Sequence, residues 1–153
     1  MRILELKIPP PVVALAVGLL MWLAAQVVPS FAWPATARLA AAVVLAALGA
    51  SFDVAGFVSF RRARTTINPL RPARASSLVV TGVYRYTRNP MYVGAALLLL
   101  AWAAFLANAA AFLLVPVFAL YLTRFQIIPE ERALSGIFGA EYRAYCGRVR
   151  RWL

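Results

Sequence analysis

The sequence predicts an all-α integral membrane protein with four transmembrane helices, the last two forming a tight hairpin, followed by a C-terminal amphipathic helix. Composition is the first reason. Of the 153 residues 63% are hydrophobic, and the mean hydropathy is +0.78, whereas soluble domains are typically about 45–50% apolar. A chain of this size buries only about two-thirds of its surface on folding, so the excess apolar surface requires lipid.

The apolar residues fall into four segments, which is the second reason. They are expected at about residues 8–28, 35–60, 92–106 and 109–125. The first two are close to, or longer than, the roughly 20 residues that cross a bilayer. Pro29 and Pro34 break the chain between them, and Asn108 leaves almost no loop between the last two.

The arginines supply the third observation and predict the topology. The connector 61–91 contains seven arginines and no acid, and six more arginines follow from Arg124, whereas the turns at 29–37 and 107–108 contain no basic residue. Cytoplasmic loops carry an excess of Lys and Arg, so both termini and the connector are expected in the cytoplasm. With no cleavage signal evident, we expect one membrane domain, 1–153, in a bacterial inner membrane.

A further helix is expected at about residues 129–149, because Pro129 suits the first turn of a helix. Apolar and aromatic residues recur there every three or four positions: Leu134, Ile137, Phe138, Tyr142, Tyr145 and Val149. This spacing is typical of an amphipathic helix, which would lie against the cytoplasmic membrane face or against the connector.

Composition also excludes several functions. The chain has no histidine and a single cysteine, Cys146, so an intrachain disulfide and a cysteine metal cluster are impossible. The commonest general base and metal ligand is missing, and no metal site is expected. A basic excess can indicate nucleic-acid binding, but these arginines lie at the edges of apolar runs, where they suit anionic headgroups.

Two polar clusters are expected on the cytoplasmic side. One is "TGVYRYTRNPMYVG" at residues 81–94, and the other is "EER" at residues 130–132. The hairpin brings its two cytoplasmic ends together, which places Arg88, Asn89 and Tyr92 near the two glutamates. A cationic and aromatic loop facing two carboxylates suits a soluble charged cofactor on one side and a lipid-borne substrate on the other.

Each feature also has a structural interpretation. Arg85 and Arg88 would anchor the chain to headgroups, and the tyrosines would form an interfacial aromatic belt. Asn89 and Pro90 fit the N-cap and first turn of the third helix. Asp53 lies within the second apolar segment, where an acid usually has a function, although pairing with a connector arginine is the favoured interpretation.

The order of the motifs resembles the isoprenylcysteine carboxyl methyltransferase family, whose wider group includes bacterial phospholipid methyltransferase-like proteins. The resemblance rests on "TG-x-Y-x-x-x-R-N-P-x-Y-x-G", a short apolar hairpin, and "EE-x-x-L-x-x-x-F-G-x-x-Y-x-x-Y", and it covers roughly residues 65–153. It implies an integral membrane enzyme that uses S-adenosylmethionine and methylates a lipophilic or lipid-anchored acceptor.

Carried over by position, the resemblance implies a set of cofactor-binding residues: Leu78, Val79, Gly82, Tyr84, Arg88, Asn89, Pro90, Tyr92, Gly94, Glu130 and Glu131. An arginine would pair with the cofactor carboxylate, a glutamate would hold its ammonium or ribose hydroxyls, and a tyrosine would stack on adenine or face the sulfonium. Many family members have histidine where this chain has Asn89, which cannot take up a proton at neutral pH.

Glu131, Tyr92 and Arg124 are the candidate catalytic residues, with Arg124 expected to orient an acidic acceptor. Methyl transfer depends mainly on positioning in a dry site. A carboxylate acceptor needs no base, whereas an amine must first lose a proton, so both O- and N-methylation remain open. The alternative function is a membrane lipid oxidoreductase that uses NADPH, and a third is a non-enzymatic membrane partner. The oligomeric state is not predicted.

Overall fold

The computed structural model describes residues 5–63 and 77–153, and these residues form helices and no strand. In chain order the elements are α1 (Pro10–Val27), α2 (Ala35–Arg62), the short 3₁₀ helix η2 (Gly82–Arg85), α3 (Pro90–Leu106), α4 (Ala109–Leu122), the π-helical turn η3 (Thr123–Ile127) and α5 (Ile128–Arg148). The predicted all-α class is confirmed for this part of the chain. Most of the expected connector, residues 64–76, lies outside the described residues.

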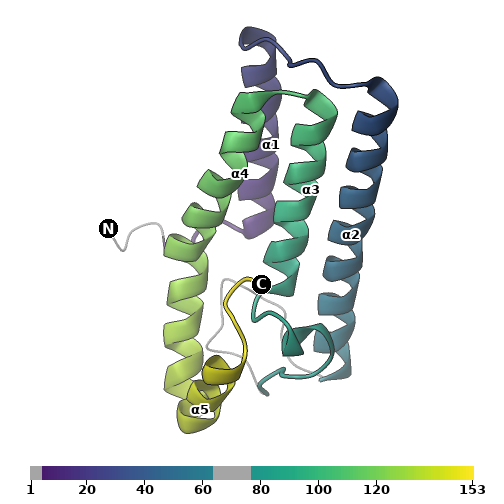
Figure 1. The fold of residues 1–153 in the computed structure, drawn as a ribbon. Coiled ribbons are helices and arrows are strands. Elements are labelled where there is room, and N and C mark those ends of the chain that lie inside the picture. The colour runs from purple at the N-terminus through teal and green to yellow at the C-terminus, as the bar shows by residue number, and fades with distance from the viewer. Residues whose placement is uncertain (1–4, 64–76) are drawn as a thin grey trace.

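The helices α1 to α4 form a bundle in which α3 packs between α2 and α4, while α1 packs against α3 and α4 (Figure 1). The connection from α1 to α2 and the turn from α3 to α4 lie at one end. The elements η2 and α5 and the C-terminus lie at the other (Figure 1). The residues of the two predicted polar clusters are therefore at the same end of the bundle.

Three helical runs are long and apolar enough to cross a membrane: α1, α2 and the continuous run Ala109–Arg148. The helix α3 has 17 residues, which is near the lower limit of about 17 residues for a spanning helix. The four-span count therefore stays a prediction. The outer faces of the long helices suit lipid, since Leu15 is 76% exposed and Val27 is 83% exposed.

The core of the bundle joins α1, α3 and α4. Buried side chains recur at steps of four or seven positions on each helix, as one helical face requires: Val13, Val17 and Met21 on α1, Leu99 and Ala103 on α3, and Ala111, Phe118 and Leu122 on α4. The contact between α2 and α3 is instead made by glycines. A Cβ on Gly49 would lie 2.8 Å from the carbonyl oxygen of Gly94, so these two backbones approach closely, as small residues allow.

The fourth predicted segment does not end at residue 125. The helix runs from α4 through η3 directly into α5, and Pro129 lies in the first turn of α5. Because Pro129 has no N–H to donate to the preceding turn, the carbonyl of Phe125 accepts from the N–H of Leu6 at 3.0 Å instead. π-Helical turns inside longer helices are frequent at functional sites. Glu130 and Glu131 are thus carried on a continuous helical extension of α4 rather than on a separate helix after a loop.

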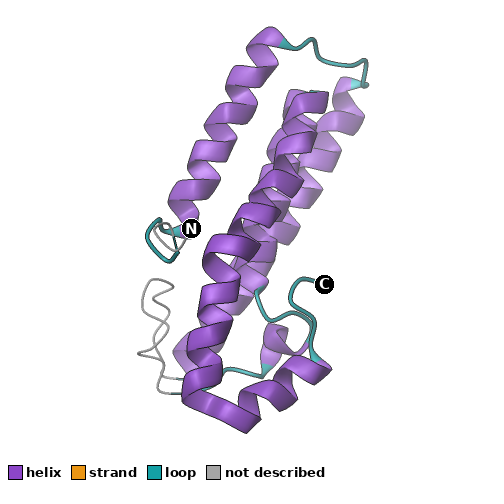
Figure 2. Cartoon of the chain, turned by 90° about the vertical axis from the view of Figure 1, so that its left-hand side faces the viewer, coloured by secondary structure: helices purple, strands orange, loops and turns teal. Residues whose placement is uncertain are grey.

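The helix α5 bends at Gly139, whose φ of 51° is a conformation that favours glycine. Figure 2 shows α5 crossing beneath the bundle. Most of the predicted stripe packs on the connector: Tyr142, Tyr145 and Val149 are buried with Leu134, Phe138, Leu78 and Val80. Ile137 differs from the rest of the predicted stripe, since its side chain is 43% exposed.

Candidate functional site

A cavity of about 1290 Å³ lies between α1, α2, α3 and α5. Pockets for a single drug-sized molecule are typically about 300–1,000 Å³, so this cavity has room for more than one small ligand. Its lining is polar and aromatic at the end near η2 and α5, where these residues face it: Ser77, Tyr84, Arg88, Asn89, Tyr92, Glu130, Glu131, Tyr142 and Tyr145. The two predicted polar clusters therefore both contribute residues to one cavity, as expected if the hairpin brings its two ends together.

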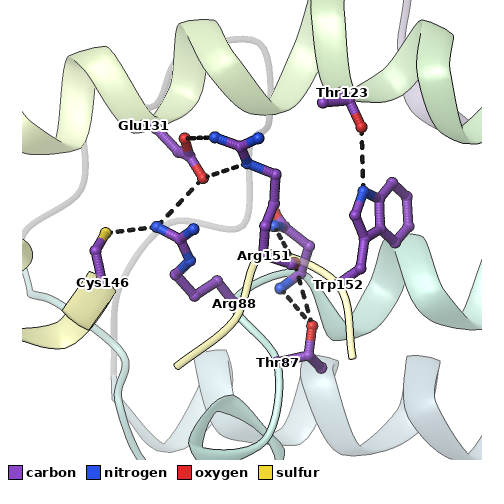
Figure 3. Close-up of polar contacts among 8 residues, drawn as sticks. Thr87, Arg88, Thr123, Glu131, Cys146, Arg151 and Trp152 are labelled. Atoms are coloured by element: carbon purple, nitrogen blue, oxygen red, sulfur yellow. Dashed lines mark hydrogen bonds and ion pairs between the residues drawn. The ribbon is translucent and has the colours of Figure 1, made fainter. Parts of the chain in front are cut away.

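Glu131 lies between two arginines (Figure 3). Its Oε1 is 3.3 Å from Nη1 of Arg88, and Arg151 donates to both carboxylate oxygens, from Nε at 3.0 Å and from Nη2 at 2.8 Å. The hydrogen bond that Arg151 donates to Glu131 raises the pKa of Arg151 above its usual value. Two guanidinium groups around one carboxylate leave one positive charge in excess, which suits an anionic ligand group.

Arg88 is placed to present that excess positive charge to a ligand. Its side chain is 13% exposed, Nη1 also donates to the sulfur of Cys146, and its Nε is buried with no hydrogen-bond partner among the described residues. A buried donor without a partner is costly and usually indicates a missing ligand, ion or water. Arg88 thus has a free donor close to the cavity that it lines.

Glu130 has a different environment from its neighbour. Its Oε1 accepts hydrogen bonds from the hydroxyl of Tyr92 at 2.7 Å and from Nε2 of Gln126 at 2.7 Å. Both donors are neutral, and no ion pair to Glu130 is found among the described residues. Glu130 therefore has no described cation as a partner, whereas Glu131 is shared by two arginines.

The C-terminal tail, residues 149–153, completes this end of the site. The N–H of Arg88 donates to the carbonyl of Arg150 at 3.0 Å, and Nδ2 of Asn89 donates to the carbonyl of Arg151 at 2.8 Å. The indole of Trp152 donates to Oγ1 of Thr123 at 3.1 Å (Figure 3). Asn89 occupies the predicted N-cap position of α3, but its side chain makes no capping bond because it holds the tail instead.

The connector supplies another wall. Leu78, Val79 and Tyr84 line the cavity, and Tyr84 packs edge-on against Phe60 with ring centroids 5.4 Å apart. The hydroxyl of Tyr145 donates to the carbonyl of Tyr84 at 2.8 Å. Burial raises the pKa of Tyr84, so its phenol stays protonated at physiological pH. Its aromatic ring is fixed at the mouth of the polar end.

Four predicted site residues do not line the cavity. Gly82 has a φ of 62° and lies against Ser59, Pro90 forms the first turn of α3, and Gly94 makes the close contact with α2. Arg124 binds Glu5 at 2.8 Å, as does Arg132. Arg124 thus anchors the N-terminal segment and does not face the predicted acceptor.

Asp53 lines the cavity from α2. No ion pair to it is found among residues 5–63 and 77–153, so the predicted pairing with a connector arginine is absent for Arg61, Arg62, Arg85 and Arg88. The other candidates, Arg64, Arg71 and Arg74, lie outside the described residues. The sequence marked Asp53 only as an acid inside an apolar segment, because its place in the cavity depends on how α2 packs on α3.

The rest of the lining is apolar and comes largely from α1 and α2. Leu15, Leu19 and Trp22 face the cavity from α1, and Val54 and Phe57 face it from α2. These side chains are between 44% and 76% exposed. Because α1 packs on α3 and α4 rather than on α2, the apolar chamber opens sideways between α1 and α2, toward the region that lipid would occupy.

Comparison with known families identifies the architecture. The phospholipid methyltransferase family matches residues 37–141, more than half of the chain. The chain belongs to this family. Its long apolar helices and its membership together indicate an integral membrane methyltransferase, and the predicted resemblance is confirmed.

The extent of the match refines that resemblance. It begins within α2, well before residue 65, so that Asp53 is included with the two motifs, and it ends before the tail. A stretch of 63 residues, 41% of the chain, is 49% identical to an uncharacterized protein of Haemophilus influenzae and covers all of that protein. No solved structure matches the chain.

Proposed function

We propose that the protein transfers a methyl group from S-adenosylmethionine to a lipophilic or lipid-anchored acceptor at the cytoplasmic face of a membrane. The observation that carries the proposal is that one cavity joins a charged, aromatic end to an apolar chamber open between α1 and α2. A charged cofactor and a lipid-borne acceptor need these two environments side by side. Family membership supports methyl transfer as the reaction.

The residues at the polar end fit the cofactor. The partnerless Nε of Arg88 suits the cofactor carboxylate, and Glu130, which faces only neutral donors, suits its ammonium or its ribose hydroxyls. Glu131 is the weaker candidate for that contact because two guanidinium groups already share it. Tyr84 and Tyr92 offer aromatic faces for adenine or for a cationic centre.

When bound, S-adenosylmethionine supplies a methyl group on a positively charged sulfur, already activated for displacement. The protein then has to hold the acceptor in line with that methyl group and exclude water. Leu78, Val79 and the apolar faces of α1 and α2 provide the dry wall. The cytoplasmic location follows from charge, because Arg88, Arg150 and Arg151 lie at the site end and cytoplasmic loops are rich in arginine.

The experiment is a transfer assay on the purified protein in lipid nanodiscs, with methyl-labelled S-adenosylmethionine and a total lipid extract. We expect label in the lipid phase from the wild type and from Glu141→Gln, a control that changes the same charge on an exposed side chain. Glu130→Gln should lose most of the transfer. Wild-type protein that incorporates no label but oxidises NADPH in the presence of lipid would reject the proposal in favour of an oxidoreductase.

A further inference from the structure

We infer that a groove between α2 and α3 binds an anionic phospholipid, with the lipid phosphate on Arg38 and one acyl chain in the groove. The groove lies toward the end of the bundle that carries the turn from α3 to α4, opposite the candidate site (Figure 1). The lipid would be a bound component of the protein and not a methyl acceptor. The inference therefore goes beyond the proposed function, and its test requires neither cofactor nor methyl transfer.

The groove has a volume of about 360 Å³ and an apolar lining from both helices: Ala42, Val43, Ala46, Leu98, Ala101, Trp102 and Phe105. Of these, Ala42 and Ala101 are buried, whereas Val43, Leu98 and Phe105 are exposed. Small side chains thus form the floor and larger ones form the sides, which is the shape that holds a narrow chain.

The packing of α2 on α3 explains why space remains there. At Gly49 the two backbones nearly touch, since a Cβ at that position would lie 2.8 Å from the carbonyl oxygen of Gly94. Ala42 lies seven residues away, about 10 Å along the axis, and its methyl group does not fill the groove. An empty apolar groove loses dispersion contacts, and water finds no polar partners in it. A hydrocarbon chain is the filling that suits it.

Arg38 is placed to hold the other end of such a lipid. It lies one turn before Ala42, and its guanidinium carbon is 5.8 Å from the ring centroid of Phe105, which lines the groove. From Arg38 to Ala46 the helix rises about 12 Å, close to the roughly 15 Å depth of one leaflet. A phosphate on Arg38 would therefore lie near the membrane surface, with its chain running inward along the groove.

The charge distribution decides the headgroup. Apart from Arg38, residues 8–52 and 89–123 contain no charged side chain, and no ion pair to Arg38 is found in the described part of the chain. A guanidinium group without a carboxylate suits a phosphate, which it can bind through two N–H groups. The ammonium group of a zwitterionic lipid would find no acid at this end, so a headgroup with a net negative charge is favoured.

Trp102 connects the groove to the rest of the bundle. It lines both the groove and the larger cavity, and its indole N–H donates to the carbonyl of Gly18 on α1 at 3.1 Å. An acyl chain packed against Trp102 would hold the indole in the orientation that this bond requires. The bound lipid should therefore stabilise the packing of α1 on α3.

The test uses two photoreactive phospholipids with the same chains and a diazirine in one of them, a phosphatidylglycerol and a phosphatidylcholine. Each is added at a low mole fraction to the protein in nanodiscs of unlabelled phosphatidylcholine, and cross-linked peptides are identified by mass spectrometry. We expect the phosphatidylglycerol to label residues 42–46 and 98–105 about tenfold more than the phosphatidylcholine does, the scale of one charge-assisted contact.

Four variants separate the charge from the groove. Arg38→Gln should remove the preference for phosphatidylglycerol, whereas Arg62→Gln, which removes the same charge at the other end of α2, should keep it. Ala46→Leu narrows the groove without a change in charge and should reduce labelling there by both lipids. Ala47→Leu is its matched control, because Ala47 is exposed and does not line the groove.

Equal labelling of the groove by the two lipids would overturn the inference, and so would a preference that survives in Arg38→Gln. Native mass spectrometry of the same samples tests the other possible occupant, a second copy of the chain. A dimer that Ala46→Leu disrupts, with the groove unlabelled in the wild type, would replace the lipid site by a dimer interface.

Discussion

The two ends of the helical bundle both bury polar groups next to apolar helices, but they use them differently. At the turn between α3 and α4, Asn108 is fully buried, its Oδ1 accepts a bond from the N–H of Ala111 at 3.2 Å, and its Nδ2 donates to the carbonyl of Val28 at 2.6 Å. The N–H of Phe31 donates to the carbonyl of Ala107 nearby. The turn end is closed, with its polar groups satisfied locally or by the adjacent α1–α2 connection.

The end of the bundle that carries the cavity has more charged side chains, and not all of its polar groups have partners among the described residues. Arg88 keeps a partnerless Nε, Glu130 faces neutral donors, and the cavity that they line continues into an apolar chamber. Its contacts include bonds between the start of α3 and the C-terminal tail, such as the one from Asn89 to the carbonyl of Arg151. The difference indicates that polar groups at a helix end serve stability where they satisfy each other, and binding where they leave donors and charges facing a cavity.

Arg88→Ala should produce the largest effect, because it removes the partnerless donor and one of the two cations at Glu131. We expect about a 100-fold loss of affinity for S-adenosylmethionine, since truncating one member of a buried charge pair costs about 2–5 kcal/mol. The measurement is equilibrium binding in nanodiscs. Arg85→Ala is the matched control, an exposed arginine three residues away. Equal losses in the two variants would mean that both act only through general charge.

Asn108→Ala tests the turn end of the bundle, where polar groups are expected to serve stability. It removes the cap on α4 and leaves the carbonyl of Val28 without its donor, which should lower the free energy of unfolding by about 2 kcal/mol. Denaturant unfolding in detergent measures this, with Gln26→Ala as an exposed amide control expected to change little. Transfer activity per folded molecule should equal that of the wild type, and a selective loss of activity would remove the distinction between the ends.

Arg151→Gln tests whether the tail belongs to the site. Glu131 would keep only Arg88, which would then be less available to a ligand, so we expect the KM for S-adenosylmethionine to rise about tenfold with kcat nearly constant, the scale of one charge-assisted bond. Steady-state transfer kinetics measure the split. Arg150→Gln changes an exposed neighbour and should leave KM unaltered. A fall in kcat alone would place Arg151 outside cofactor binding.

Tyr92→Phe should have the smallest effect. It removes the hydroxyl that donates to Glu130 at 2.7 Å and keeps the aromatic ring, so about a fivefold loss of transfer activity is expected, close to 1 kcal/mol for one hydrogen bond. Tyr86→Phe is the control, because Tyr86 is 74% exposed. A loss as large as that of Arg88→Ala would make the Tyr92 hydroxyl a main catalytic group instead of a positioning one.

Much of this arrangement was predictable because it depends on local signals. Pro29, Pro34 and Asn108 end or begin helices through their own backbone chemistry, so the ends of α1, α2 and α3 lie within about two residues of the sequence predictions. The meeting of Arg88 with Glu131 also follows from a local feature, since a hairpin with a minimal turn returns its two far ends to one place.

The rest depends on tertiary contacts that no local pattern encodes. Because the helix continues through η3, the helix end expected at residue 125 does not occur. No residue type marks a π-helical turn in a sequence as clearly as proline marks the end of a helix. The tail reaches Arg88 and Asn89 through backbone carbonyls, which are the same in any sequence. Asp53 reaches the cavity only because Gly49 and Gly94 allow α2 and α3 to approach, a contact that neither helix specifies alone.

The most direct test of the account is equilibrium binding of labelled S-adenosylmethionine to the wild-type protein in nanodiscs, with S-adenosylhomocysteine and NADPH as competitors. The account predicts saturable binding that S-adenosylhomocysteine displaces and NADPH does not. Arg88→Ala should weaken this binding about 100-fold, and Arg85→Ala should retain it. Saturable binding of NADPH with none of S-adenosylmethionine would contradict it.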